Sequence, residues 1–221
     1  MASPKDRAAL PERPFLYAII DAAMTMTSSR SLSEWVELLA GEGRAAVVQW
    51  RFKGLADREA LAGARELRAA TQRAGVLFFV NDRPDIARMV DADGLHVGQD
   101  DLSPSEARAL LPNALLGVST HNPAQFEVAA ASEADYIAVG PVFKTQSKAA
   151  PDPVVGLEFV AWAAARSPRP IVAIGGLNAG NAGSVVRSGA RGVAVISELM
   201  KAPDPGAAAR ALVGQIALGA S

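Results

Sequence analysis

A cluster of polar and charged residues follows a short apolar run near position 50. The run ends in Gln49-Trp50-Arg51-Phe52-Lys53. Because side chains on a strand alternate between two faces, Gln49, Arg51 and Lys53 share one face. An Arg beside a Lys suits a polyphosphate, since the guanidinium is a planar fork and the ammonium a point charge. The alternative is that Arg51 and Lys53 are solvated loop charges.

Carboxylates follow the next two apolar runs, at Asn81-Asp82 and at Gly98-Gln99-Asp100-Asp101. If these runs are neighbouring strands, Asp82 and one of Asp100 and Asp101 can meet at their ends. Magnesium prefers one or two carboxylates, with water and substrate phosphate completing its shell, so the pattern indicates a magnesium site. Taken singly, each aspartate is more often a helix cap or a turn residue.

Small and hydroxyl-bearing residues follow the later runs. Gly175-Gly176 and Ile196-Ser197 follow the last two apolar runs. If these runs are the last two strands of a (β/α)8 barrel, their ends are where such barrels often bind phosphate through backbone N–H groups, although a Gly-Gly pair also makes a tight turn. Ser119 lacks a G-x-S-x-G elbow, so it is not interpreted as an acyl-transfer nucleophile. The hydroxyls and the ammonium that could orient an oxygen-rich ligand belong to Ser119, Thr145, Ser147 and Lys148.

These residues follow short runs rich in Val, Ile and Phe that alternate with Ala-rich amphipathic stretches, which is typical of repeated βα units. Eight near-regular units favour a single (β/α)8 TIM barrel over an open doubly wound sheet. In such a barrel the active site lies at the carboxyl ends of the strands. The expected strands begin at Phe15, Ala45, Val76, Gly94, Leu115, Tyr136, Pro170 and Gly192.

Length and composition agree with one domain. The 221 residues fit a flexible N-terminal tail over 1–13 and a barrel over 14–221. The absence of cysteine excludes disulfides and thiolate sites. A net charge of −1 argues against a nucleic-acid partner, and the lack of a long apolar run argues against a membrane partner, so we expect a cytoplasmic protein. Small phosphorylated molecules are the expected partners, and a homo-oligomer is possible.

Several segments together resemble the thiamine phosphate synthase family, in the same order along the chain. VNDRPDIA followed by DGLHVGQDDL is the most specific pair. The other matching segments are QWRFK, GVSTH, YIAVGPVFKTQSK, IVAIGGL and GVAVIS. Members of this family are TIM-barrel transferases that join hydroxymethylpyrimidine diphosphate to thiazole phosphate and release pyrophosphate. The resemblance therefore implies that activity and a need for Mg²⁺.

The resemblance also assigns roles to residues. It places Mg²⁺ on Asp82 and Asp101, and Ser119 beside the reacting pyrimidine. It implies a dissociative reaction without a protein nucleophile, in which Arg51 and Lys148 stabilise the leaving pyrophosphate. The residues implied for the pyrimidine diphosphate are Gln49, Arg51, Lys53, Asn81 and Lys148. The residues implied for the thiazole phosphate are Thr145, Ser147, Gly176, Ile196 and Ser197.

Two positions depart from the family pattern, because Lys144 stands where proline is usual and Phe52 where a polar residue is common. Two other functions stay open from the sequence. One is the related thiazole tautomerase, an isomerase that also has a histidine at the position of His121. The other is a non-catalytic regulator that binds a thiamine-related phosphate. The retained Asp82 and Asp101 favour the synthase.

Overall fold

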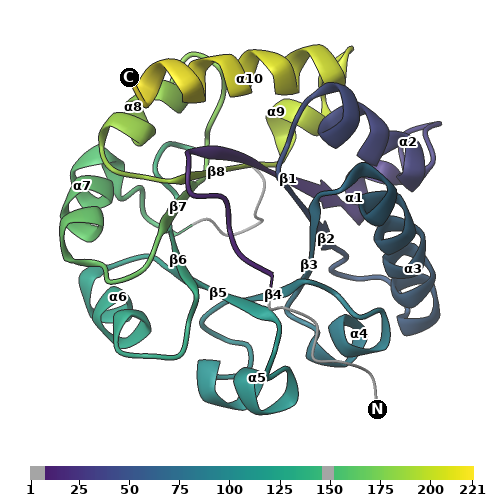
Figure 1. The fold of residues 1–221 in the computed structure, drawn as a ribbon, viewed down its shortest axis with the longest axis horizontal. Coiled ribbons are helices and arrows are strands. Elements are labelled where there is room, and N and C mark those ends of the chain that lie inside the picture. The colour runs from purple at the N-terminus through teal and green to yellow at the C-terminus, as the bar shows by residue number, and fades with distance from the viewer. Residues whose placement is uncertain (1–7, 146–151) are drawn as a thin grey trace.

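The computed structural model describes residues 8–145 and 152–221, which form a closed barrel of eight parallel strands (Figure 1). Each strand pairs with the next along the chain, and the first pairs with the last. The predicted TIM barrel is confirmed, and the open sheet is excluded. The strands are β1 (Phe15–Asp21), β2 (Val47–Arg51), β3 (Leu77–Asn81), β4 (Gly94–Val97), β5 (Leu115–Thr120), β6 (Tyr136–Val139), β7 (Ile171–Ile174) and β8 (Gly192–Val195).

Helices surround the barrel as an outer ring (Figure 1). Their starts follow from local cap chemistry: Ser103 and Glu106 form a capping box, and Asn122 accepts a hydrogen bond from the N–H of Gln125. The helices are α1 (Ala22–Thr25), α2 (Leu32–Val36), a π-helix η1 (Glu37–Glu42), α3 (Asp57–Ala74), α4 (Pro84–Met89), α5 (Pro104–Leu110), α6 (Pro123–Ala130), α7 (Gly156–Arg166), α8 (Ala182–Arg187), α9 (Ser197–Met200) and α10 (Pro205–Gly219).

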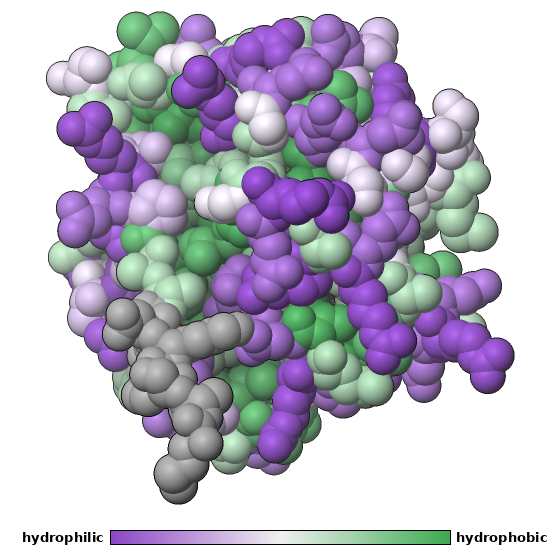
Figure 2. Space-filling model, turned by 45° about the vertical axis from the view of Figure 1, so that its right-hand side comes forward, coloured by the Kyte–Doolittle hydropathy of each residue, from purple (hydrophilic) through white to green (hydrophobic). Residues whose placement is uncertain are grey.

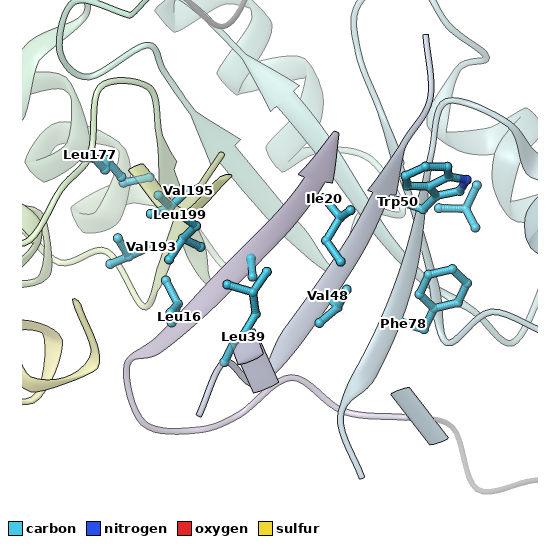
Figure 3. Close-up of a cluster of buried hydrophobic side chains, with 14 of the residues drawn as sticks. Leu16, Ile20, Leu39, Val48, Trp50, Phe78, Leu177, Val193, Val195 and Leu199 are labelled. Carbon is cyan, nitrogen blue, oxygen red and sulfur yellow. The ribbon is translucent and has the colours of Figure 1, made fainter. Parts of the chain in front are cut away.

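The strands are apolar on both faces because each face is covered. The outward side chains, such as Leu16 and Ile20 of β1 and Trp50 of β2, belong to a large cluster between the sheet and the helices (Figure 3). The inward side chains, such as Phe79 and Val172, form a second cluster inside the barrel. This alternation sends Gln49 and Arg51, on either side of Trp50, towards the barrel axis.

Glycines inside the barrel make room for aromatic rings. A Cβ at Gly94 would overlap the ring of Phe79, and a Cβ at Gly117 would overlap the ring of Tyr136. The rings of Phe79 and Tyr136 meet edge to face, with centroids 5.9 Å apart. These rings therefore fill the barrel interior beneath the polar residues at the strand ends.

The segment before β1 runs across the barrel opening at the N-terminal ends of the strands (Figure 1). Ala8 and Leu10 pack against the inner cluster from this side. The structure describes only residues 8–13 of the expected tail, so the flexibility of residues 1–13 and the domain boundary at residue 14 stay predictions. The contacts of Leu10 show that part of this segment covers the barrel.

The face in Figure 2 is covered mainly by hydrophilic residues, with hydrophobic ones interspersed. Within residues 8–145 and 152–221, no helix is both long and apolar enough to cross a membrane.

Candidate functional site

A cavity of about 710 Å³ opens at the carboxyl ends of the strands. This is the end at which barrels of this class carry their active sites. The polar residues that line it are Gln49, Arg51, Lys53, Asn81, Asp82, His96, Gln99, Asp100, Asp101, Ser119, His121, Gln125 and Asp152. The residues expected to bind the pyrimidine diphosphate therefore lie in one cavity, apart from Lys148, which falls outside the described residues.

Gln49 and Arg51 of β2 line this cavity together with Lys53, which lies in the turn after the strand. Gln49 is buried, and its amide donates a hydrogen bond of 2.8 Å to the hydroxyl of Tyr17. Arg51 donates a hydrogen bond to the carboxylate of Asp21. Lys53 is 62% exposed, but its Nζ lies 3.2 Å from Oδ2 of Asp82. Arg51 is thus held in an ion pair at the cavity wall, whereas Lys53 lies in a turn, as the alternative expected, but is paired with Asp82.

Asp82 and Asp101 meet at the rim of the barrel, as carboxylates from neighbouring strands. Burial first, and then the nearby Asp101, raise the pKa of Asp82 to about 6, although Lys53 offsets part of this shift. Oδ2 of Asp101 also accepts a 2.7 Å hydrogen bond from the N–H of Gly98. Asp100 is exposed. The structure therefore brings Asp101, and not Asp100, against Asp82.

The backbone of Asp82 has a φ of +63°, in the left-handed region that few non-glycine residues adopt. Its N–H donates a 2.8 Å hydrogen bond to the carbonyl of His96 in β4, which fixes this conformation. The N-cap of α4 is Arg83, and no side chain caps this helix. Asp82 is therefore not a helix cap, and backbone strain at a cavity residue is typical of functional sites.

The hydroxyl of Ser119 lies 2.8 Å from Nε2 of His96. The other ring nitrogen of His96 lies 2.8 Å from the hydroxyl of Tyr136, which in turn lies 3.1 Å from that of Tyr17. The amide of Gln99 donates a 2.6 Å hydrogen bond to the carbonyl of Ser119. Ser119 is thus held by both its side chain and its backbone at the cavity floor.

A second cavity adjoins the first across Ser119 and His121, between β5, β6, β7 and β8. Its lining includes Thr145, Gly175, Gly176, Ile196 and Ser197. Gly176 has a φ of +67°, and an added Cβ would lie 2.5 Å from the carbonyl oxygen of Lys144. Glycine is therefore required there. Ser147, the other residue expected at the thiazole phosphate, lies outside the described residues.

The two departures from the family pattern have different surroundings. Phe52 is buried, and its ring lies 5.8 Å from that of Trp50, centroid to centroid. Lys144 lines a groove that begins at Gly176 and Ser197 and continues to Lys201. Phe52 thus belongs to the core, whereas Lys144 adds a positive charge beside the expected phosphate site.

His121 bridges two strand ends. Its Nδ1 lies 2.6 Å from the carbonyl oxygen of Gly140, and its Nε2 lies 3.5 Å from Oδ2 of Asp152. Since a carbonyl only accepts, Nδ1 carries the hydrogen. The ring lines both cavities.

Several residues of the site escaped sequence reasoning, among them Gln125, Asp152, Asp21, Tyr17 and Tyr136. Asp21 ends β1, where its carboxylate accepts from the N–H of Ala23 and from Arg51. Tyr17 and Tyr136 read as ordinary strand residues, although both are buried with their hydroxyls in contact. The only sequence signal was a phenol within each apolar run. The contact between Tyr17 of β1 and Tyr136 of β6, across the barrel interior, is not encoded locally.

The carboxylates suit a cation that also binds substrate. Within the described ranges, no group of three or more His, Cys, Asp or Glu side chains is placed to hold a metal ion alone. Asp82 and Asp101 supply two oxygen ligands in a polar cavity, which matches the preference of magnesium for few carboxylates plus water and phosphate.

Comparisons with known proteins agree with one another. The family model described as thiamine monophosphate synthase matches residues 16–199. A thiamine-phosphate synthase from Chloroflexus aurantiacus is 46% identical over 89% of this chain and 90% of its own length. One from Thermus thermophilus is 41% identical over 89% of this chain and 94% of its own length.

Solved structures give the same family and a wider fold class. The thiamine phosphate pyrophosphorylase from Pyrococcus furiosus superimposes with a TM-score of 0.83 at 33% identity, covering 94% of this chain and 97% of that one. Orotidine 5'-phosphate decarboxylase from Pyrococcus horikoshii has a TM-score of 0.65 at 18% identity, over 90% of this chain and 99% of that one. The second likeness shows the barrel fold alone.

Proposed function

Since the chain belongs to the thiamine monophosphate synthase family, we infer that it is a transferase that makes thiamine phosphate from two phosphorylated precursors. The observation that carries this inference is the division of the barrel mouth into two adjoining cavities. One has paired carboxylates and cations, and the other has a Gly-Gly pocket. A reaction that joins a diphosphate to a monophosphate needs both.

We propose that the first cavity binds hydroxymethylpyrimidine diphosphate. Arg51 and Lys53 carry the positive charge, while Gln49 and Asn81 supply amide groups from the ends of β2 and β3. Lys148 is proposed for the same diphosphate from its sequence motif. The cations favour the leaving pyrophosphate because its charge grows as the bond to the methylene carbon breaks.

Mg²⁺ is proposed to bind between Asp82 and Asp101. The raised pKa of Asp82 supports this, because two carboxylates in contact inside a partly buried cavity lack a full complement of positive charge. When bound, the ion would neutralise charge on the diphosphate oxygens. Lys53 contributes a positive charge to the same carboxylate, with its Nζ 3.2 Å from Oδ2 of Asp82.

The second cavity is proposed to bind the thiazole phosphate. Gly176, Thr145 and Ser197 line this cavity, so the backbone of Gly176 and the hydroxyls of Thr145 and Ser197 are the groups proposed to bind the phosphate. Ile196 lines both cavities and is suited to contact the ring between them. The hydroxyl of Ser147 is proposed for this phosphate from its motif.

The proposed reaction needs orientation more than covalent help. The C–O bond between the pyrimidine methylene carbon and the diphosphate breaks, the pyrimidine ring stabilises the resulting cation, and the thiazole nitrogen donates its electron pair to form the C–N bond. Pyrophosphate leaves with the bonding pair. Ser119 lies where the cavities adjoin and would contact the reacting pyrimidine, so the protein acts by positioning and electrostatics.

Two alternatives fit the site less well. A thiazole tautomerase needs no diphosphate and therefore no Asp82–Asp101 pair, although His121 lines the cavity as such an enzyme would require. A non-catalytic regulator has no need to keep Arg51 ion-paired at the wall. Location in the cytoplasm and a homo-oligomeric state stay predictions.

The test is synthesis in vitro. Purified protein, the two phosphorylated precursors and MgCl₂ should yield thiamine phosphate and pyrophosphate in equal amounts, with none formed when either precursor is omitted. Offering the tautomerase substrate to the same preparation gives the comparison. Isomerisation without coupling at saturating precursor would show that the protein is a tautomerase and not a synthase. If neither reaction is observed, the result would favour the non-catalytic regulator.

A further inference from the structure

Five polar side chains form a hydrogen-bonded chain through the barrel interior. Gln49 Nε2 lies 2.8 Å from the hydroxyl of Tyr17, which lies 3.1 Å from that of Tyr136. The Tyr136 hydroxyl lies 2.8 Å from Nδ1 of His96, and Nε2 of His96 lies 2.8 Å from the hydroxyl of Ser119. The chain thus crosses from β2 through β1, β6 and β4 to β5.

The first contact sets the direction of the chain. Gln49 turns its amide NH₂, rather than its amide oxygen, towards Tyr17, and because an NH₂ only donates, the oxygen of Tyr17 accepts in this arrangement. The hydrogen of Tyr17 then points to the oxygen of Tyr136, and the hydrogen of Tyr136 points to Nδ1 of His96. The reverse order would leave the Tyr17 hydrogen without an acceptor in this chain, at a fully buried position, which is costly.

Both phenols keep their hydrogens. Burial raises the pKa of Tyr17 and of Tyr136 well above the ordinary value, so neither ionises at neutral pH. The edge-to-face packing of Tyr136 on Phe79 and the space at Gly117 fix the position of the Tyr136 ring. Each hydroxyl therefore has one hydrogen to donate and one direction in which to donate it.

We propose that this chain holds His96 as the Nε2–H tautomer and thereby makes Ser119 a hydrogen-bond donor towards the bound ligand. Because Nδ1 of a neutral imidazole accepts from Tyr136, the hydrogen of the ring is on Nε2 and is donated to Ser119. The Ser119 oxygen accepts it, and its own hydrogen is directed into the cavity. Tyr17, Tyr136 and His96 are positioning residues that act through Ser119.

The consequence is a rule for the ligand, which rests on the proposed function. The ligand atom opposite Ser119 must accept a hydrogen bond, as a ring nitrogen of a pyrimidine does and as an amino group or a C–H does not. Discrimination of this kind is strong, since a buried donor facing a non-acceptor stays unpaired. Ser119 therefore selects the orientation of the pyrimidine as well as its identity.

The first experiment reads the tautomer without substrate or activity. The sequence has two histidines, so ¹⁵N-histidine labelling gives two imidazole rings, and the His121→Asn variant assigns them. At pH 8 we expect His96 to be neutral with its hydrogen on Nε2. His121, whose Nδ1 donates to Gly140, should show the opposite tautomer. A hydrogen on Nδ1 of His96, or a charged His96 ring, overturns the proposal.

The second experiment perturbs the chain. Tyr136→Phe keeps the ring but removes the hydroxyl that donates to His96 and accepts from Tyr17, so the His96 ring should become a mixture of tautomers. Circular dichroism and thermal melting should show that the barrel is intact. If that variant does not fold, Tyr17→Phe removes the preceding link and should have the same effect more weakly. An unchanged His96 spectrum in a folded variant contradicts the direction assigned here.

The third experiment links the chain to binding. Tyr136→Phe and Ser119→Ala should each raise KM for the pyrimidine diphosphate roughly 3- to 10-fold, the size of one neutral hydrogen bond, with KM for the thiazole phosphate unchanged. The double variant should lose little more than Ser119→Ala, because both remove one contact. Additive losses would separate Tyr136 from Ser119. A wild-type protein without synthase activity would refute the function and leave the tautomer result standing.

Discussion

Asp82 and Asp101 come from the ends of β3 and β4, and their carboxylates face each other across the rim of the barrel. Burial first, and then Asp101, raises the pKa of Asp82 to about 6. Lys53 offsets part of this effect through its ion pair with Asp82. Ionisation of both carboxylates therefore destabilises the free protein, and a bound cation would reduce their repulsion.

Replacing Asp82 by Asn should stabilise the free protein at neutral pH. The pKa of Asp82 rises on folding from 3.8 to about 6, so its ionisation destabilises the folded state increasingly from about pH 4 and fully above pH 6. The variant should melt higher by roughly 3–6 °C at pH 7.5, corresponding to about 1–2 kcal/mol, and should show no gain at about pH 3.5. Thermal melts at both pH values check this.

The control is Asp100→Asn, at the exposed neighbour, which should change the melting temperature at neither pH. An equal shift of the melting temperature of Asp82→Asn at both pH values would contradict the electrostatic cause.

Magnesium should stabilise the wild-type protein through the same pair. We expect MgCl₂ to raise the melting temperature of the wild type and of Asp100→Asn, and to have little effect on Asp82→Asn and Asp101→Asn. The reason is that a ligand that binds only the folded state stabilises it by mass action. A titration followed by thermal melting, with KCl at matched ionic strength, measures the effect. A shift in Asp101→Asn equal to that in the wild type would exclude Asp101 as a ligand.

Asp21→Asn should weaken binding of the diphosphate more than it weakens the fold. Asn keeps an oxygen that can accept from Ala23 N–H, so the cap of α1 is retained, while the ion pair with Arg51 is lost. With Arg51 no longer oriented, KM for the pyrimidine diphosphate should rise about tenfold, corresponding to about 1.4 kcal/mol. Steady-state kinetics with each precursor varied separately provide the test. An equal rise of KM for both precursors would indicate a general disturbance of the site.

Gly176→Ala should impair binding of the thiazole phosphate, and the chain offers a matched control. Gly75 has a φ of +69°, nearly that of Gly176 at +67°, but a Cβ at Gly75 meets nothing within 4 Å. Gly75→Ala should therefore show only the backbone cost, about 1 kcal/mol. Gly176→Ala should lose more stability and raise KM for the thiazole phosphate severalfold, because its Cβ meets Lys144 and Phe143. Chemical denaturation and steady-state kinetics compare the two variants. Equal losses of stability would mean that the backbone conformation alone, and not the contact with Lys144 and Phe143, causes the effect.

The sequence predicted what is encoded locally. Five strands, β1, β4, β5, β6 and β8, begin at the residues expected from the sequence, and the other three begin one or two residues later. The polar residues after each apolar run lie at one end of the barrel because parallel strands bring those ends together. What was missed depends on pairs far apart in the chain. Tyr17 and Tyr136 are 119 positions apart, and nothing near either residue shows that their hydroxyls meet.

The aromatic floor of the cavity has a consequence for how this sequence can change. Gly117 is compatible with Tyr136 only because it has no side chain, and Gly94 has the same relation to Phe79. A larger residue at 117 requires a smaller one at 136, and that exchange would deepen the cavity and remove the hydroxyl that faces His96. Positions 117 and 136 are therefore expected to vary together among descendants of this chain, and a change at either one alone should be selected against.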